Sequence, residues 1–476
     1  MVLGVIGIVI SLVGLIWLAY RGWSVVLIAP LLALVACIFN VLGTGNDLMA
    51  GYTNGFMPNL ANYVKTYFPI FMLGAVFGKM MDDSGSARAI ANFIMDKLGP
   101  GKEVIATVVT CAILTYGGVS LFVVVFAVYP IAAAMFRRAD LPKRLIAPAI
   151  ALGAFTFTMT AIPGTPQIQN AIPMPFFGTD VFAAPVLGVI AAVIMAGGGL
   201  WWLNRQEKKM RAAGEGYGNH PNEDIRITDD MNLPSFGISL VPIIFVLIAN
   251  FVFSKVVMPN NNIVPENIIW TDSAQVPDGD HVINIAKSGV IGNWSLIWAL
   301  VIGIILVILF NFKRYENVPT SLKNGVSSSF LAILNTASEV GYGNVIKTLA
   351  GFTVVATGMQ AISGGSVLVL DIVSTSTLAG ITGSASGGMS IALSVFGEQM
   401  VTMANNAGIS PEALHRVCSV ASGGLDTLPH NGAVLTLLAA TGLTHRESYK
   451  NMCVCTVIIP LIAAFIIAGL GTLGVN

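Results

Sequence analysis

Two stretches near the carboxyl end decide how this chain folds: residues 383–388 read GSASGG, and residues 423–431 read GGLDTLPHN. The first separates two apolar runs, Val367 to Ile381 and Met389 to Met403, each shorter than the ~20 residues that a transmembrane helix needs. The sequence therefore predicts a re-entrant hairpin. The second stretch interrupts a helix with glycines, a proline and ionisable groups, which membrane proteins tolerate where protein or a wet cavity satisfies the freed backbone groups.

Composition places the whole chain in a membrane. Of its 476 residues, 55% are hydrophobic and 10% are charged, whereas about a quarter are charged in soluble domains. The formal net charge is +0, so no basic surface suggests a nucleic-acid partner. The five cysteines lie in apolar runs without metal-ligand spacing, and we expect neither a metal nor another cofactor.

The hairpin and the broken helix have earlier counterparts. Residues 115–120 separate the apolar half-spans Val104 to Leu114 and Leu121 to Met135, which predicts a first re-entrant hairpin over 103–137. A helix then breaks at residues 160–167, which predicts a broken helix over 143–178. The second copy consists of a hairpin over 366–406 and a broken helix over 410–441.

Three short matches support an internal repeat, because their offsets drift little. Residues 116–118 match 386–388 at an offset of 270, residues 141–142 match 410–411 at 269, and residues 162–164 match 428–430 at 266. Broken segments in corresponding positions are typical of transporter repeats.

The predicted fold is an all-α integral membrane protein with about ten transmembrane helices in two inverted-topology repeats, each with a re-entrant hairpin and a broken helix. The first repeat spans 1–203, the linker 204–235, and the second repeat 236–476. Within the first repeat, Gly43 to Thr66 is rich in Gly and Asn, and spans are expected from Tyr67 to about Met81 and from Val181 to Leu203. Five crossings per repeat is an odd number, so the repeats must be inverted.

Basic residues predict the orientation. Of the 24 Lys and Arg, all but five fall on one side of this topology, the exceptions being Lys65, Lys255, Lys287, Lys347 and Arg416. Basic loops stay cytoplasmic. The linker is therefore predicted to be cytoplasmic, both termini are predicted outside, and the acidic loop from Met258 to Ser288 is predicted external.

The breaks predict an anion site. A helix that starts inside the membrane presents free N–H groups and a partial positive charge, and two hairpin tips with two broken helices bring several such ends together. A small organic acid anion is the expected guest; for each side chain, capping and packing of the turns is the alternative role. The predicted substrate-binding residues are Tyr116, Gly117, Gly118, Ser120, Thr160, Gly164, Thr165, Gln167, Ser384, Ser386, Gly387, Gly388, Thr427, His430 and Asn431.

Ionisable groups in apolar segments are candidates for proton coupling, because such groups are rare there. They are His430, Asp426, Glu339 and Asp371. His430 with Asp426 forms the preferred pair, since a histidine titrates near neutral pH. The alternative is that Asp426 caps a half-helix and that His430 only donates a hydrogen bond to the substrate.

These residues resemble the gluconate:proton symporter family, within the ion transporter superfamily. The resemblance covers nearly the whole chain and is strongest at 73–84, 383–386 and 408–431. It implies uptake of small hydroxylated monocarboxylates across a bacterial inner membrane, coupled to a proton or to sodium, and a homodimer. Residues 116–118 and 162–166 depart from the acidic tip and the Pro-Pro-His-Pro break of gluconate carriers, which favours the 3-hydroxybutyrate or short-chain hydroxy acid branch.

Three other classes were weighed. An enzyme is not expected, because neither His-Glu-x-x-His nor Gly-x-Ser-x-Gly occurs. A channel would need a continuous pore instead of two opposed hairpins. A sodium-coupled dicarboxylate carrier or organic anion exchanger of the same superfamily stays the alternative; a dicarboxylate would need a second cationic anchor, for which Arg416 and Lys79 are the candidates.

Overall fold

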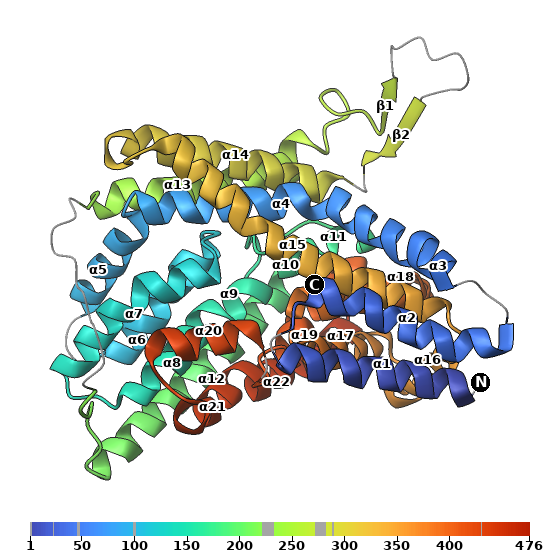
Figure 1. The fold of residues 1–476 in the computed structure, drawn as a ribbon. Helices are drawn as coiled ribbons and strands as arrows, with labels where there is room; N and C mark the ends of the chain where they lie inside the picture. Colours follow the sequence, from blue (N-terminus) through green and yellow to red (C-terminus); the bar gives the residue numbers. More distant parts are fainter. Residues whose placement is uncertain are drawn as a thin grey trace.

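The computed structural model describes residues 2–21, 23–44, 48–98, 101–220, 233–271, 282–287, 290–429 and 431–476, and it is predominantly helical (Figure 1). The first half consists of α1 (Val2–Tyr20), α2 (Val25–Thr44), α3 (Leu48–Ala50), η1 (Gly51–Phe56), α4 (Met57–Asp83), α5 (Ser86–Leu98), α6 (Glu103–Tyr116), α7 (Leu121–Arg138), η2 (Lys143–Leu145), α8 (Ile146–Ala154), α9 (Phe157–Thr160), α10 (Ile168–Ala171), α11 (Met174–Phe177) and α12 (Pro185–Ala212).

The second half begins after the linker and follows a similar order of elements. It consists of α13 (Phe236–Val252), η3 (Phe253–Val257), β1 (Asn267–Thr271), β2 (Val282–Ala286), α14 (Ile291–Asn311), η5 (Phe312–Arg314), α15 (Val318–Thr348), α16 (Phe352–Ser363), α17 (Val367–Thr382), α18 (Ala385–Ala407), α19 (Pro411–Leu425), α20 (Gly432–Thr441), α21 (His445–Cys453), η6 (Val454–Ile458) and α22 (Ile459–Thr472).

The helix interruptions lie where the sequence placed them. Residues 117–120 separate α6 from α7, and Gly383 and Ser384 separate α17 from α18. Gly383 ends α17 in the left-handed conformation, and the Ser384 hydroxyl caps α18 by accepting from the Gly387 N–H at 3.1 Å. The first broken helix is more fragmented than predicted, because it already breaks at Phe155 and Thr156 and then again over 161–167.

Two expected boundaries and the all-α composition of the fold were wrong. The helix expected to begin at Tyr67 begins earlier, because residues 51–66 are helical as η1 and the start of α4, where Phe56 and Tyr63 are buried against neighbouring helices. Helix α12 continues nine residues past Leu203 into the predicted linker and ends at Ala212. The loop after η3 carries a two-stranded antiparallel ribbon, β1 with β2, so the fold is not purely α-helical.

The two halves pack reciprocally. Helices α1 and α2 contact α16 and α15 of the second half, whereas α13 and α14 contact α5 and α4 of the first half (Figure 1). The corresponding helices α4 and α15 cross each other, and Gly325 permits the contact, since a Cβ there would lie 2.8 Å from Val76 Cα. This exchange of partners agrees with a repeat, while the inverted orientation of the repeats stays a prediction.

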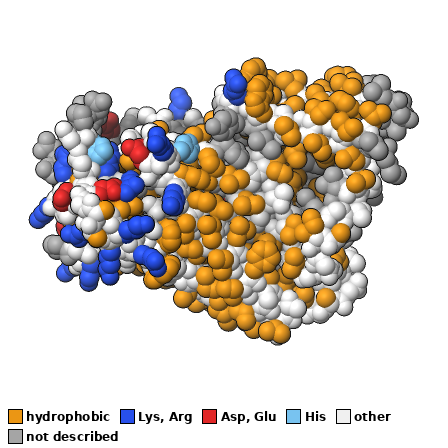
Figure 2. Space-filling view, turned by 90° about the horizontal axis from the view of Figure 1, so that it is seen from below, with side chains coloured by type: hydrophobic (Ala, Val, Ile, Leu, Met, Phe, Trp, Pro, Cys, Tyr) orange, Lys and Arg blue, Asp and Glu red, His pale blue; other side chains and the backbone are white. Residues whose placement is uncertain are grey.

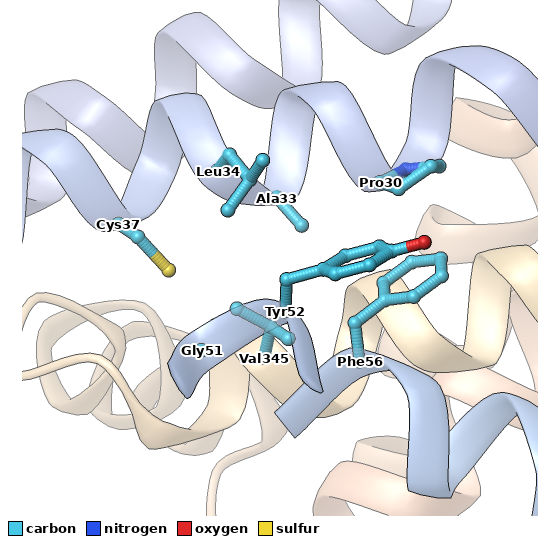
Figure 3. A pocket seen from close by; sticks show the side chains of 8 residues that line it. All are labelled: Pro30, Ala33, Leu34, Cys37, Gly51, Tyr52, Phe56 and Val345. Carbon is cyan, nitrogen blue, oxygen red and sulfur yellow. The ribbon is translucent and has the colours of Figure 1, made fainter. Parts of the chain in front are cut away.

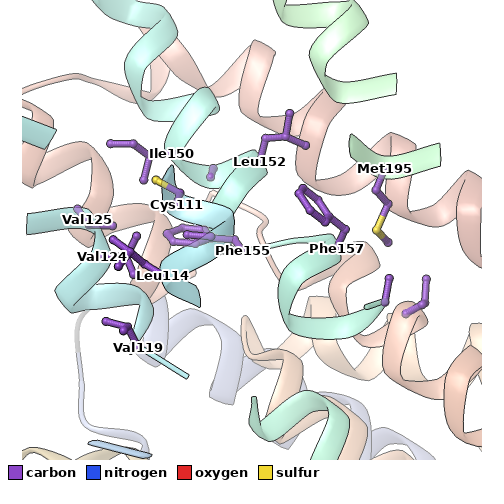
Figure 4. Close-up of a cluster of buried hydrophobic side chains, with 14 of the residues drawn as sticks. Cys111, Leu114, Val119, Val124, Val125, Ile150, Leu152, Phe155, Phe157 and Met195 are labelled. Atoms are coloured by element: carbon purple, nitrogen blue, oxygen red, sulfur yellow. The ribbon is translucent and has the colours of Figure 1, made fainter. Parts of the chain in front are cut away.

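A hydrophobic core joins the first hairpin to the first broken helix. Figure 4 shows side chains from α6, α7, α8 and α12 meeting in one cluster. Cys111 and Leu114 of α6 are fully buried there with Ile150 and Leu152 of α8. The packing holds the hairpin against the segment that contains the helix break.

The outer surface is suited to lipid. Large side chains such as Leu3, Val193 and Leu309 are more than half exposed, and hydrophobic side chains cover most of the face in Figure 2. Among the described residues, five helical stretches are long and apolar enough to cross a membrane: Leu48–Asp83, Pro185–Ala212, Phe236–Val257, Ile291–Arg314 and His445–Thr472. The predicted total of ten crossings stays a prediction.

Most Lys and Arg side chains visible in Figure 2 gather at one end of the molecule. Contacts there join the first hairpin to the linker: Arg144 pairs with Glu215, and the Arg137 guanidinium lies 5.5 Å from the centre of the Tyr217 ring. The first turn of α21 also contacts this region, because the Ser448 hydroxyl donates to the Arg144 carbonyl at 2.8 Å. On the face shown, the basic side chains thus gather at one end, and the orientation of the protein in the membrane stays a prediction.

If this basic end is cytoplasmic, cysteines placed at its surface and at the β ribbon end will label oppositely. Asn219 and Asn262 are exposed, whereas a side chain on Gly216 would collide with the Asp140 carboxylate. With the native cysteines replaced, an impermeant maleimide added to intact cells should label Asn262→Cys and not Asn219→Cys. Labelling of Asn219→Cys before membranes are opened would contradict the orientation.

Candidate functional site

The first hairpin tip rests on the first helix break. The Tyr116 hydroxyl at the end of α6 donates to the Pro163 carbonyl at 2.9 Å. The Gln167 side-chain amide donates to the Thr115 carbonyl at 2.6 Å, across from the break to the hairpin. Two predicted substrate-binding residues, Tyr116 and Gln167, therefore tie the tip to the break in this structure.

Helix α4 covers the same tip. A Cβ on Gly78 would lie 3.1 Å from the Ser120 backbone nitrogen, so α4 approaches the start of α7 closely. Gly118 has φ of +88°, which favours glycine, and a Cβ there would meet Pro166 at 3.1 Å. The tip is thus enclosed between α4 and the break.

The second tip is tied to its own break in the same way. The Asn431 amide donates to the Gly383 carbonyl at 2.8 Å, and its side-chain oxygen accepts from the N–H groups of Ala433 and Val434 at 2.6 and 3.0 Å. Asn431 therefore caps α20 and also holds the tip. In each half a side-chain amide at the break bonds to a carbonyl at the end of the hairpin's first helix, Gln167 in one and Asn431 in the other.

The predicted tip glycines meet different neighbours. A Cβ on Gly117 would lie 2.7 Å from Ile243 of α13, and one on Gly388 would collide with the Ala379 backbone of α17. These two glycines permit close helix packing in this structure. A Cβ on Gly387 would coincide with Oε2 of Glu339, so a carboxyl group of the protein occupies that space.

Three of the four predicted proton-coupling residues can be placed. Glu339 on α15, Asp371 on α17 and Asp426 at the end of α19 are all buried, and each has one carboxyl oxygen without a hydrogen-bond partner among the described residues. Asp371 also accepts from the Thr375 hydroxyl at 3.1 Å. His430 lies outside the described residues.

The remaining predicted substrate-binding residues lie near the end of the chain, at the first break and at the second tip. Thr427 donates to the Thr456 hydroxyl at 2.7 Å and so packs on η6. Thr160 and Thr165 are buried at the first break, and the Thr165 hydroxyl has no partner within the part of the chain that the structure describes. Gly164 lies at the same break with φ of +87°, and Ser386 lies at the second tip, 3.4 Å from the Ser384 hydroxyl.

Arg416 of α19 is a residue whose structural role the sequence did not reveal. Its side chain is fully buried, and its five N–H groups make five hydrogen bonds of 2.8–3.3 Å, all to oxygens of the first half. The acceptors are the carbonyls of Thr160, Val181 and Ala183, the last accepting twice, and the side-chain oxygen of Asn170.

His415 extends this network. One ring nitrogen lies 3.1 Å from the Asn170 side-chain oxygen and the other 2.6 Å from the Thr179 hydroxyl. The Asn170 amide in turn donates to the carbonyls of Thr165 and Val181. Adjacent buried His and Arg on a helix that also carries a break were a sequence signal for this network, whereas nothing in the sequence marked Asn170.

A separate hollow lies away from both tips. Figure 3 shows it between α2 and η1, with the stacked rings of Tyr52 and Phe56 on one side. It is lined by Pro30, Ala33, Leu34, Cys37, Gly51, Tyr52, Phe56 and Val345, none of which was predicted to bind substrate. Its apolar lining suits packing or lipid.

Paired hairpins and broken helices inside an apolar helical shell define a membrane transporter, not an enzyme. The chain belongs to the GntP family permeases, whose family profile matches residues 3–473. It is 44% identical over 453 residues to the Bacillus subtilis (strain 168) protein named "Uncharacterized transporter YxjC", covering 93% of this chain and 94% of that one. It is 26% identical over 337 residues to the high-affinity gluconate transporter of Escherichia coli (strain K12), covering 68% and 66%.

Solved structures show a similar fold. The Alcanivorax borkumensis YdaH transporter superposes with a TM-score of 0.55 at 15% identity, covering 97% of this chain and 98% of that one. MtrF of Neisseria gonorrhoeae gives 0.53 at 13% identity and covers 94% of each chain. At these identities the likeness concerns the fold.

Replacing Arg416 should destabilise the protein strongly. Arg416→Met removes five buried hydrogen bonds and takes away both donors that the structure shows for the Ala183 carbonyl, and a buried polar group left without a partner costs about 1–3 kcal/mol. We expect that loss in the free energy of unfolding, measured by reversible SDS unfolding in mixed micelles.

The matched control is Arg211→Met on the exposed end of α12, where Arg211 pairs with Glu207 at 3.4 Å. An exposed pair of this kind contributes about 0–1 kcal/mol. Equal stability of the Arg416 and Arg211 variants would contradict the structural role of Arg416.

The two functions of Asn431 can be separated. Asn431→Ser keeps an N-cap oxygen but is too short to reach Gly383, whereas Asn431→Ala loses both contacts. We expect Ala to lower stability by about 0.5–2 kcal/mol more than Ser, because only Ala loses the cap, and both variants to lose transport because the tip is released. Full transport by Asn431→Ser would show that the link to Gly383 is dispensable.

Proposed function

We propose that this permease couples the entry of a proton to the entry of a small hydroxylated monocarboxylate, such as 3-hydroxybutyrate or gluconate, by alternating access. The observation that carries the proposal is the pair of hairpin tips, each tied by a side-chain amide to a helix break. Helix starts at such breaks offer N–H groups to a carboxylate. The 26% identity to a gluconate transporter supports an organic acid substrate.

The proposed binding residues are those predicted from the sequence. Some would contact the substrate directly, whereas others would position the hairpin tips. At the first site, the Thr165 hydroxyl lacks a partner, as do the buried Thr115 hydroxyl and the Gln169 side-chain oxygen, which the sequence reading missed. Buried polar atoms without partners are expected where a polar ligand binds. Gln167 and Asn431 position the tips.

The two side chains that could have served as a cationic anchor are already bonded within the protein. This favours a monocarboxylate substrate over a dicarboxylate. All five N–H groups of Arg416 are already bonded within the protein. Lys79 is paired with Asp83 at 2.6 Å, one turn away on α4. Neither is free to serve as the second anchor that a dicarboxylate needs.

The finer features of the transporter belong to the same proposal. They are about ten crossings in inverted repeats, a location in a bacterial inner membrane, both termini outside, and a homodimer. The proposed proton-coupling residues are chosen from the four predicted from the sequence, His430, Asp426, Glu339 and Asp371. A sodium-coupled dicarboxylate carrier or an organic anion exchanger is the competing function.

Transport by reconstituted vesicles tests the proposal. Labelled 3-hydroxybutyrate and gluconate are offered with an inward proton gradient or an inward sodium gradient, imposed separately, and protein-free vesicles serve as the control. We expect accumulation of at least one acid with the proton gradient alone, without competition by excess succinate. Accumulation driven only by sodium, or competition by succinate as strong as by the unlabelled acid, would favour the competing function.

A further inference from the structure

Glu339 has an unusual place in the fold. It lies on α15 with 3% of its side chain exposed, and its Oε2 has no hydrogen-bond partner in the described structure. That oxygen points at the first turn of α18 and occupies the space that a Cβ on Gly387 would take. Only glycine at this position leaves room for the carboxyl group.

This space belongs to the second hairpin tip. Helix α18 begins at Ala385 and is 23 residues long, so its first turn carries a partial positive charge. The Ser384 hydroxyl caps that turn, and the Ser386 hydroxyl lies 3.4 Å from the hydroxyl of Thr336 on α15. The surroundings suit one carboxylate, and Glu339 already supplies it.

We propose that the Glu339 carboxylate is an internal competitor for the substrate's carboxylate at the second hairpin tip, and that proton uptake by Glu339 admits the substrate. The inference rests on the proposed function and deepens it, because it assigns the coupling of proton and anion to one position. Two carboxylates cannot both be ionised in such a small buried space, since like charges repel strongly there.

Few other groups face this carboxyl. From α4, Tyr63 is close enough to interact electrostatically with Glu339, and its hydroxyl lies 3.4 Å from Ser390 of α18. On the other elements that pack on α15, α2 carries Cys37 and η1 carries Tyr52, while α16 has no ionisable side chain. Helix α4 also carries Lys65 and Lys79, and α15 carries Lys323 and Lys347; Lys79 pairs with Asp83, and Lys347 donates to the Ser394 carbonyl instead of to Glu339.

At the first hairpin tip, the corresponding helix does not place a carboxyl group in the described structure. There α4, which corresponds to α15, meets the hairpin through Gly78, which has no side chain to extend toward the tip. The competitor is therefore confined to one of the two tips, and one site per protein would titrate with substrate.

The proton balance follows from this exchange. Water on one side of the membrane gives a proton to Glu339, and the neutral carboxylic acid yields the tip to the substrate anion. Proton and anion then cross together as a neutral pair. On the other side the anion leaves, the carboxyl loses its proton to water, and the carboxylate returns to the tip.

The measurement is the pH dependence of the apparent KM for exchange of labelled gluconate or 3-hydroxybutyrate between pH 6 and 10, with equal pH on both sides, so that the range includes conditions in which a buried carboxyl is ionised. Where Glu339 is mostly ionised, the binding-competent fraction falls about tenfold per pH unit, so the wild-type KM should rise tenfold per unit. Glu339→Gln is permanently neutral, so its KM should vary by less than about twofold over the range. It should exchange substrate but fail to accumulate it against a gradient.

Controls separate this inference from the proposed function. Glu398→Gln removes an exposed carboxyl from the same helix α18 and should keep the wild-type slope. A wild-type KM that does not change with pH overturns the inference without any variant. A Glu339→Gln protein that keeps the wild-type slope, or loss of the slope in His430→Gln instead, also overturns it. Failure of the wild type to exchange any monocarboxylate rejects the proposed function as well.

Discussion

The structure depends on the guanidinium group of Arg416. It donates hydrogen bonds to backbone carbonyls around an interrupted helix, a role that water would have at an exposed site. The carbonyls of Thr160, at the first break, and of Val181 and Ala183, in the turn before α12, lie outside regular helical bonding, and Arg416 donates to all three from a different helix. Inside a lipid-facing protein such groups depend on donors from the protein itself, which Ser419 and Gly164 also supply to Thr160 and Val181. The charge on Arg416 is thus surrounded by carbonyl dipoles in place of an acidic side chain. Because Arg416 belongs to the second half of the chain, the break in one half is completed by the other.

The same rule explains both hairpin tips. Each tip ends a helix in a turn whose carbonyls need donors, and an amide from the neighbouring break provides one. Each hairpin tip is hydrogen-bonded to the neighbouring helix break. The two hairpins and the two broken helices therefore form two pairs of linked segments. A substrate that draws on N–H groups at a tip is therefore held by two segments of chain at once.

Much of this was predictable because interruptions leave a local signature. Gly383 and Ser384 end one helix and cap the next, so the second hairpin could be placed within a residue or two. The start of α4 was missed because its stability comes from packing of Phe56 and Tyr63, which composition does not reveal. The Arg416 network and the meeting of Glu339 with Gly387 join positions far apart in sequence, and single-sequence reasoning has no measure of such pairing.

The exchange of partners between the halves also governs how the protein is made. Helices α1 and α2 emerge first from the ribosome, yet they pack on α15 and α16, which begin at Val318 and Phe352. They must wait in the lipid, without their final neighbours, until most of the chain has been inserted. Neither half can complete its own core, so a nascent chain released after the linker would present unpaired helices to the quality-control proteases of the membrane.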